Sequence, residues 1–285
     1  MPPAATLLRR LEESAEAFST NQRVLARFVA ANYQAVAFAT ISELAEQSGV
    51  SEATIVRFAK ALDFSGYPAL QKEIRRLVRA ELPGAERLKL GARAKPAAAT
   101  PLDLVIDNER ENIASLHESF DAKSFGRARE MLRGASEVLV AGTRSTAALA
   151  CHLAFALNKL AIATTRALSI SSETYDLVSR LEKRALVVVI GFPRYLRETV
   201  DLLEFARGRG LSTLTITDSA FSPLKGEVSL YAPAESASFV AFHCAPLILV
   251  NALVHELSVA DGERTLEALD RFEEVAEDRR YFVKT

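Results

Sequence analysis

Residues Leu44–Phe64 read LAEQSGVSEATIVRFAKALDF, which is the pattern of two short helices joined by a tight turn. Gly49 adopts the backbone conformations of such a turn at no steric cost, and Ser51 is a residue type that caps the start of a helix. Small Ala45 allows the two helices to cross closely. The apolar residues expected on their shared inner face are Leu44, Val50, Ile55 and Phe58. The stretch therefore predicts a helix-turn-helix.

The outer edge of the second predicted helix is polar and suits contact with DNA. A recognition helix inserts this edge into the major groove, where Arg57 can offer two donors to guanine and Lys60 can meet a phosphate. The residues predicted to contact DNA are Ser42, Ser51, Glu52, Thr54, Arg57 and Lys60. Any helical hairpin with a glycine turn has a similar pattern, so a purely structural hairpin is the alternative.

The distribution of charge favours DNA contact by the first part of the chain. The whole sequence has a formal net charge of -1. Residues 1–96, however, hold 14 Lys and Arg against 10 Asp and Glu, a charge of +4, which leaves -5 for the remainder. Because exposed charges act within about 10 Å at moderate salt, the local excess matters more than the total.

The spacing of apolar residues changes between the first and second parts of the sequence. Residues 1–80 have apolar residues at the spacing of helices and predict an all-α domain. Residues 81–104 are rich in Pro, Gly, Ala and Lys, and they predict a solvated linker with one short helical turn. Over residues 105–285, short β-branched runs alternate with helical segments. This alternation predicts βαβ units around a parallel sheet flanked by helices.

The composition is that of a soluble globular protein of 285 residues, with 49% hydrophobic and 25% charged residues. The sequence contains no run of about 18 uncharged apolar residues, and its start lacks the pattern of a signal peptide. We therefore expect a cytoplasmic protein that does not bind membranes. The two cysteines and four histidines show no spacing typical of a disulfide framework or a metal site, so no metal and no cofactor are expected.

The segment Thr40–Ile74, TISELAEQSGVSEATIVRFAKALDFSGYPALQKEI, resembles the N-terminal domain of RpiR-type bacterial transcriptional regulators. The motifs VSEATIVRF and LDFSGYPALQ both match in order. Those regulators carry a SIS (sugar isomerase) domain after a linker, so the resemblance extends over most of the chain. It implies an all-α helix-turn-helix domain followed by an α/β SIS domain that binds an effector and forms homodimers or tetramers.

The stretch VLVAGTRSTAALACHLAFALNKL, which begins at Val138, predicts a strand, a glycine-containing turn and a helix. Ser145 and Thr146 in the first helical turn, with the free backbone N–H groups there, would form a cradle for an anion, and Arg144 would add a positive charge. The stretch resembles the first phosphate loop of SIS domains, although Arg144 replaces a second glycine that these loops often contain. The effector-binding residues predicted here are Gly142, Thr143, Arg144, Ser145 and Thr146.

The stretch VVVIGFPRYLRETVDLLEFARGRG, which begins at Val187, stands where SIS domains that bind phosphosugars usually carry Ser and Thr followed by Glu-Thr. Glu198 and Thr199 match the end of that pattern. The positions expected to bear hydroxyl groups but lacking them are Gly191, Pro193 and Leu196. Either nearby arginines replace the hydroxyl groups by charge, or the loop has lost the phosphate, or the arginines form surface ion pairs. The remaining predicted effector-binding residues are Arg194, Tyr195, Arg197 and Ser236.

These patterns predict a DNA-binding transcriptional regulator, expected to be a repressor, whose SIS domain senses a small anionic metabolite such as a phosphosugar or a sugar acid. Its other partner would be a palindromic double-stranded DNA operator, read by a two-fold symmetric assembly.

Two alternative functions stay open at this stage. The first is a sugar-phosphate isomerase with an appended helical domain, a reaction that needs a positioned acid and base. Glu198 is the only carboxylate beside a candidate loop, so we expect no enzyme activity. The second alternative is a constitutive DNA-binding protein whose SIS domain serves only dimerisation.

Overall fold

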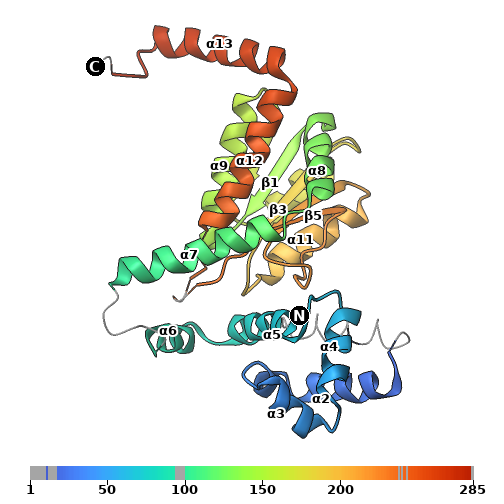
Figure 1. Cartoon of the computed structure of the whole chain (residues 1–285). Helices are drawn as coiled ribbons and strands as arrows, with labels where there is room; N and C mark the ends of the chain where they lie inside the picture. The colour runs from blue at the N-terminus through green and yellow to red at the C-terminus, as the bar shows by residue number, and fades with distance from the viewer. Residues whose placement is uncertain are drawn as a thin grey trace. The chain divides into compact units, whose positions relative to one another are not determined.

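The structure is a computed structural model that describes residue 11 and residues 18–93, 100–236, 238, 240–241 and 243–283. The chain divides into two compact units, Met1–Arg93 and Ala94–Thr285 (Figure 1). The first unit is helical, and the second contains a parallel sheet flanked by helices. The predicted fold class, an all-α domain followed by an α/β domain, is confirmed.

The first unit is built from short helices whose ends are closed by side chains. The helices described are α2 (Thr20–Val36), α3 (Ile41–Ser48), α4 (Glu52–Ala61), α5 (Tyr67–Glu81) and α6 (Gly84–Arg93). The last carbonyl groups of a helix have no partner within the helix. Here Tyr67 donates to the carbonyl oxygen of Ala39 at 2.7 Å, and Arg75 donates to that of Ala37. Side chains on one face of α5 therefore satisfy carbonyl groups in the segment that follows α2.

The segment predicted as a linker, residues 81–104, contains more helix than expected. Residues Gly84–Arg93 form the ten-residue helix α6, because GAERLKLGAR is rich in strong helix formers despite its two glycines. Helix α7 begins at Pro101, where Thr100 and Asp103 form a capping box. The division between the two units falls within the segment.

The second unit contains a five-stranded parallel sheet. The strands are β1 (Val138–Gly142), β2 (Thr164–Ala167), β3 (Leu186–Ile190), β4 (Ser212–Thr217) and β5 (Val228–Tyr231), in the order β2-β1-β3-β4-β5. The four apolar strands occur where short β-branched runs predicted them. Strand β2, with the sequence TTRA, was not predicted because its polar, partly exposed residues suit a sheet edge rather than a buried run.

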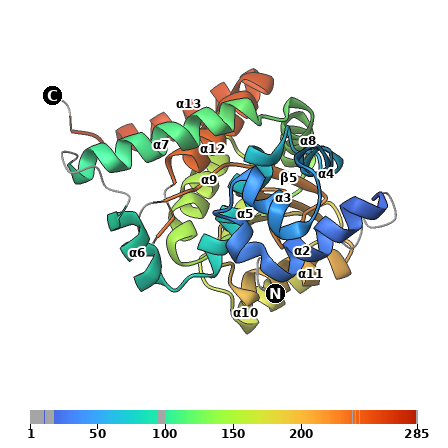
Figure 2. The ribbon, with the colours of Figure 1, turned by 60° about the horizontal axis from the view of Figure 1, so that its bottom comes forward.

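Helices cover both faces of the sheet. The helices of this unit are α7 (Pro101–Glu118), α8 (Ala122–Gly134), α9 (Ala147–Lys159), α10 (Ser172–Arg180), α11 (Arg197–Gly208), α12 (Cys244–Ala260) and α13 (Gly262–Asp278), of which α13 packs against α9 and α12. Helices α8, α9 and α12 pack on one face, and α10 and α11 pack on the other. Both views show α7 and α9 beside α12 (Figures 1 and 2). Covering on both sides explains why every residue of β1 and β3 is buried.

No single helix of the described residues combines the length and hydropathy needed to cross a membrane; α12 passes that test only jointly with Thr265–Asp278, to which it lies at 103°.

The carboxyl ends of β1 and β3 are aligned and lie next to the start of α9. Gly142 pairs with Ile190 at the end of the two strands. A Cβ atom on Gly142 would lie 2.9 Å from both the Cβ of Ala150 and the carbonyl oxygen of Thr146. Only glycine therefore lets helix α9 start this close to the strand, and this contact positions the turn that follows β1.

Candidate nucleic-acid interface and ligand site

The turn between α3 and α4 has the geometry that the sequence predicted. Gly49 adopts a left-handed conformation with φ of 70°. The Ser51 hydroxyl accepts a hydrogen bond from the Thr54 amide at 3.3 Å, which caps α4. The residues predicted on the inner face, Leu44, Val50, Ile55 and Phe58, are all buried. The two helices are thus held together by their apolar faces, and the outer edge of α4 faces solvent.

The polar edge of α4 carries exposed Ser51, Glu52, Arg57 and Lys60. Ser42, which is also exposed, donates to Oε1 of Glu52 at 2.6 Å and so joins the start of α3 to the start of α4. These side chains are available at the surface where a recognition helix would meet a groove.

Thr54 does not point outward as predicted. It is 3% exposed, and its Oγ1 accepts a hydrogen bond from Nη2 of Arg57 at 3.2 Å. Residue 54 lies beside Ile55 and one turn before Arg57, so the rotation of the helix places it at the edge of the buried face. We infer that Thr54 orients Arg57 rather than contacting DNA itself.

The loop after β1 is fixed to the end of β3 by Thr146. The hydroxyl of this residue donates to the carbonyl oxygens of Thr143 at 2.8 Å and Ile190 at 3.2 Å. Of the residues predicted to bind an effector here, Gly142, Thr143 and Thr146 are buried, whereas Arg144 and Ser145 are exposed. The expectation that the Thr146 hydroxyl is open to a ligand is therefore wrong, because backbone carbonyls already use it.

Two arginines lie in the loops that follow adjacent strands, each in a backbone conformation that favours glycine. Arg144 follows β1 with φ of 52°, and Arg194 follows β3 with φ of 70°. Both side chains are exposed, and within the described part of the chain neither makes a hydrogen bond or an ion pair. Residues held in this region cost of order 1 kcal/mol or more and are concentrated at functional sites. Arg197, at the start of α11, is a third exposed cation at this edge.

The helices that begin beside these arginines lack side-chain caps. Helices α9 and α11 start after Thr146 and Leu196, and neither residue caps its helix with a side-chain hydrogen bond. By contrast, side chains cap α3, α4 and α7. The first N–H groups of α11 therefore stay available to an anion, and the helix dipole favours negative charge there. Helix α9 instead continues from a short 3₁₀ turn, Arg144–Thr146, and its first amide, that of Ala147, donates to the carbonyl oxygen of Arg144.

Tyr195 and Ser236 differ from what the sequence predicted for a ligand site. Tyr195 donates its phenolic hydrogen to Oδ1 of Asp218, which is buried at the end of β4, so the tyrosine hydroxyl already has a partner. Ser236 follows β5, and its Oγ accepts from the amide of Ser238 at 2.9 Å. No hydrogen bond between described residues joins Ser236 to the loops after β1 and β3.

The missing hydroxyl groups of the second loop have a steric explanation at Gly191. A Cβ atom there would lie 2.4 Å from Cδ1 of Leu224, a residue that is 1% exposed. Serine therefore does not fit at position 191 while Leu224 fills this space. The chemistry that remains at this edge is cationic: guanidinium groups and helix N-termini that suit a phosphate or a carboxylate.

A further group at this edge was not predicted as part of the site. His243 immediately precedes α12, and its ring lies 5.5 Å from that of Phe192, which follows β3. Helix α12 thus begins at the same edge as the two arginine loops. Its first amide, that of Cys244, donates at 3.0 Å to Oε1 of buried Glu109 on α7. His243 is a lone histidine more than 40 residues from either loop in the sequence, so no sequence pattern indicated that it lies near them.

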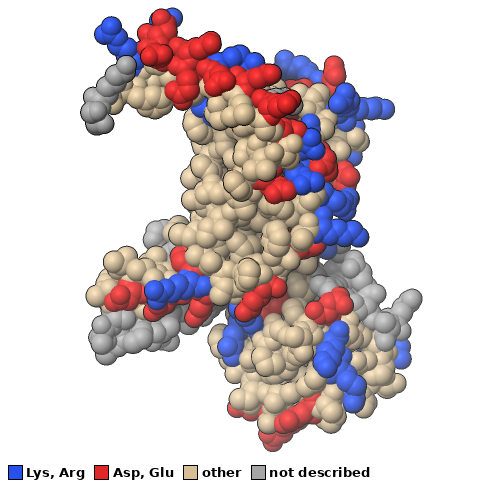
Figure 3. Space-filling view, turned by 45° about the horizontal axis from the view of Figure 1, so that its top comes forward, with Lys and Arg blue, Asp and Glu red and all other residues tan. Residues whose placement is uncertain are grey.

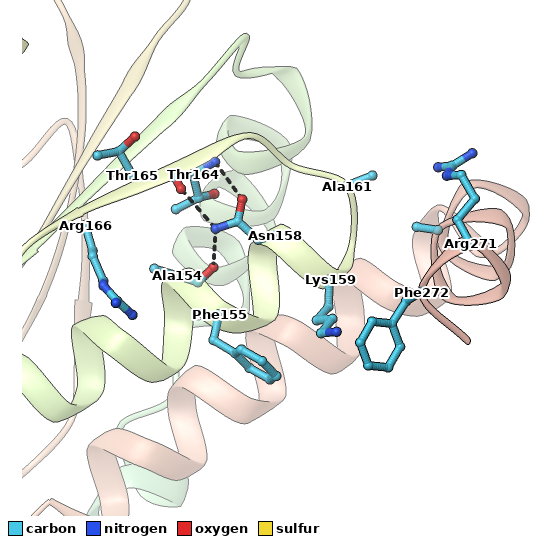
Figure 4. A pocket seen from close by; sticks show the side chains of 11 residues that line it. Ala154, Phe155, Asn158, Lys159, Ala161, Thr164, Thr165, Arg166, Arg271 and Phe272 are labelled. Atoms are coloured by element: carbon cyan, nitrogen blue, oxygen red, sulfur yellow. Dashed lines mark hydrogen bonds between the residues drawn. The ribbon is translucent and has the colours of Figure 1, made fainter. Parts of the chain in front are cut away.

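A separate hollow of about 740 Å³ lies beside β2, the edge strand of the sheet (Figure 4). It is lined by the end of α9, by β2 and by α13, and it includes Lys159, Arg166 and Arg271. The Asn158 side chain in its lining is already paired, because it donates to the carbonyl oxygen of Thr164 and accepts from its amide. Ligands of open α/β sheets bind at the carboxyl ends of the strands, so the arginine loops are the better ligand site.

Comparisons with known proteins agree with this division into two units. Residues 5–79 match the helix-turn-helix domain of the rpiR family, and residues 131–256 match the SIS domain. The HTH-type transcriptional regulator HexR from Pseudomonas aeruginosa is 26% identical over 233 residues, which cover 76% of this chain and 75% of HexR.

Two solved structures are similar in fold. The sugar isomerase domain of an RpiR transcription factor from Sphaerobacter thermophilus is 28% identical, with a TM-score of 0.60 over 62% of this chain and 99% of that domain. The NanR protein of Vibrio vulnificus, solved in complex with ManNAc-6P, is 22% identical. Its TM-score is 0.59 over 95% of this chain and 98% of NanR, and at this identity the likeness concerns the fold alone.

A helix-turn-helix unit followed by a SIS unit defines a transcriptional regulator of the helix-turn-helix type. Within that class, the chain belongs to the RpiR family.

Proposed function

We propose that this protein binds an operator in double-stranded DNA and represses transcription, and that its SIS unit changes operator affinity when it binds a small anion. The anion class is a phosphosugar or a sugar acid. The observation that carries the effector half of the proposal is the pair of unpaired arginines, Arg144 and Arg194, beside the uncapped helices α9 and α11. The guanidinium groups and the helix N-terminus would bind the anionic end of a ligand. The uncharged end of the ligand would then be free to contact other residues.

The DNA half of the proposal rests on the exposed edge of α4. Arg57, oriented by Thr54, would read a base in the major groove, and Lys60 would contact a phosphate. Ser42, Ser51 and Glu52 would position this helix start on the DNA. Glu52 also accepts from Ser42, so it stiffens the connection between α3 and α4 while offering an acceptor to a base.

A symmetric dimer through the exposed faces of α9 and α12 is part of the proposal. Phe155 of α9 is 60% exposed, and Ile248 and Val259 of α12 are 43% and 66% exposed. The two helices touch where His152 meets Asn251 at 2.6 Å. Figure 3 shows a surface over this region that is almost free of charged residues. A helix that is apolar on nearly all sides is normally buried, which favours a second copy of the chain as its cover.

The dimer proposal is tested by Ile248→Glu, with Leu88→Glu on α6 as the control for adding a carboxylate at an exposed leucine. Light scattering coupled to size exclusion should give the mass of a monomer for Ile248→Glu and the mass of the wild-type protein for Leu88→Glu. A wild-type chain that is monomeric at all concentrations would refute the dimer.

The proposed regulation is tested by measuring binding to an operator selected from genomic DNA, with and without hexose 6-phosphates, 6-phosphogluconate and inorganic phosphate. One of the sugar derivatives should change operator affinity in the wild-type protein. The double variant Arg144→Gln, Arg194→Gln should bind the operator normally and lose the response. Turnover of a sugar phosphate without any effect on DNA binding would favour the isomerase alternative, and unaltered DNA binding with every compound would favour a constitutive DNA-binding protein.

A further inference from the structure

The imidazole of His243 contains a polar atom that the fold leaves unsatisfied. Its Nε2 is buried, and no described group forms a hydrogen bond with it. A buried polar atom without a partner is costly, and most such atoms in folded proteins have partners. An exception of this kind indicates a group that serves something other than the fold.

The position of His243 relates this atom to the proposed effector site. Phe192, whose ring lies 5.5 Å from that of His243, is two residues before Arg194 in the loop after β3. The same strand end is joined to the loop after β1 by the Thr146 hydroxyl. His243 therefore lies at the carboxyl edge of the sheet, beside the cationic loops but on a different element.

The surroundings of His243 favour its neutral form. Burial lowers the pKa of the imidazole, and the carboxylate of Glu109 on α7 opposes that effect only in part. Glu109 itself is 7% exposed and accepts from the Cys244 amide at 3.0 Å and from Nδ2 of Asn112 at 3.2 Å. Its oxygens thus hold α7 against the start of α12, and neither forms a hydrogen bond with the Nε2 atom of His243.

A neutral imidazole nitrogen is either a donor or an acceptor, depending on the tautomer. A ligand hydroxyl can fill both roles, because it donates one hydrogen bond and accepts others. A phosphate group, in contrast, suits the arginines and the helix N-termini better than it suits a neutral ring. His243 is partly exposed although its Nε2 is buried, so a ligand reaches this atom only if the ring or a neighbouring side chain moves on binding.

We propose that His243 reads a hydroxyl group on the uncharged part of the effector, with Phe192 packed beside its ring, while the arginine loops hold the anionic end. This inference rests on the proposed function and assigns the specificity for the effector to one residue. His243 distinguishes a hydroxylated sugar derivative from a bare anion, which the arginines alone do not.

The test compares His243→Phe with the wild-type protein, using glucose 6-phosphate, 6-phosphogluconate and inorganic phosphate as probes in calorimetric titrations. Because phenylalanine removes the hydrogen bond and keeps the ring packing, affinity for the sugar derivative that binds the wild type should fall at least about tenfold. Affinity for inorganic phosphate should stay the same. His243→Gln, which restores a polar end, should recover part of the lost discrimination.

A second arm needs no ligand. Removing an unsatisfied buried nitrogen should leave the melting temperature of ligand-free His243→Phe equal to or above that of the wild type. His117→Phe, at an exposed histidine of α7, controls for the added ring and should not raise it. A lower melting temperature for His243→Phe means that the nitrogen serves the fold and overturns the inference.

The titrations separate failure of the inference from failure of the proposed function. Equal affinity of wild type and His243→Phe for a sugar derivative overturns the role of His243 alone. A wild-type protein that binds none of the three probes overturns the effector part of the proposed function and this inference with it.

Discussion

Tyr195 donates its phenolic hydrogen to the carboxylate of Asp218 and so joins the loop after β3 to the end of β4. Thr217 also donates to this carboxylate, at 3.1 Å. The sequence suggested Tyr195 as a ligand contact. Its position in this network makes it a residue that holds the loop bearing Arg194.

Replacement of Tyr195 by phenylalanine should therefore lower stability. Asp218 is 6% exposed, and loss of one donor to a buried acceptor costs about 1 to 3 kcal/mol. Urea denaturation of Tyr195→Phe should report this loss. Tyr231→Phe, at a tyrosine that is 37% exposed on β5, is the control and should change stability by less than about 0.5 kcal/mol. Equal unfolding free energies for the two variants would show that the bond contributes nothing to the loop.

Serine at position 191 should be harmful even though SIS domains that bind phosphosugars usually carry hydroxyl groups in this loop. The new Cβ would meet Cδ1 of buried Leu224 at 2.4 Å, and overpacking of this kind costs about 1 to 3 kcal/mol. Thermal denaturation should show a lower midpoint for Gly191→Ser. Gly191→Ser should cost less stability in a Leu224→Ala background than in the wild-type background. Gly208→Ser, at a glycine whose added Cβ would meet nothing within 4 Å, is the control. A variant Gly191→Ser as stable as the wild type would disprove the steric explanation.

The DNA-binding residues should separate by role. Arg57→Ala should lower affinity for the specific operator by about 1 to 3 kcal/mol and relax the preference for one base. Lys60→Ala should weaken specific and non-specific DNA alike and reduce the salt slope by about 1. Fluorescence anisotropy at several salt concentrations measures both effects. If Arg57→Ala binds specific and random DNA with the same ratio as the wild type, Arg57 does not read a base.

Local sequence signals predicted the helix-turn-helix well, because its glycine turn, serine cap and inner apolar face all lie within 21 residues. The pairing of Tyr195 with Asp218 spans 23 residues and depends on which strands are neighbours, which the sequence alone does not define. The prediction placed Thr54 on the outer edge of α4, whereas the structure places it at the border of the buried face. His243 lies at the edge of the arginine loops because the chain after β5 returns to the face of the sheet that α8, α9 and α12 cover.

Acidification should destabilise the protein through His243. Burial lowers the pKa of its imidazole in the folded state, so between that lowered pKa and the ordinary value near 6.5 the unfolded chain binds more protons than the folded one. Unfolding free energy should then fall as the pH decreases below about 6.5 and level off below the folded-state pKa. Urea denaturation at pH 5.0 to 8.0 measures the slope. The His243→Phe variant should show a shallower slope than the wild type, and identical slopes would contradict the shifted pKa.

Ser145 and Thr146 should behave differently when each is replaced by alanine. The Ser145 hydroxyl is exposed beside Arg144, whereas that of Thr146 is committed to the carbonyl oxygens of Thr143 and Ile190. Ser145→Ala should keep the stability of the wild type and weaken the effect of the effector on operator binding. Thr146→Ala should lower the unfolding free energy by about 1 kcal/mol or more, since it removes the hydroxyl that joins the buried carbonyls of Thr143 and Ile190. Parallel measurements of urea denaturation and effector response on the two variants decide the matter. A full response in Ser145→Ala would place the anion away from the start of α9, and an unchanged stability in Thr146→Ala would mean that the link between the β1 loop and β3 is not needed to hold the site together.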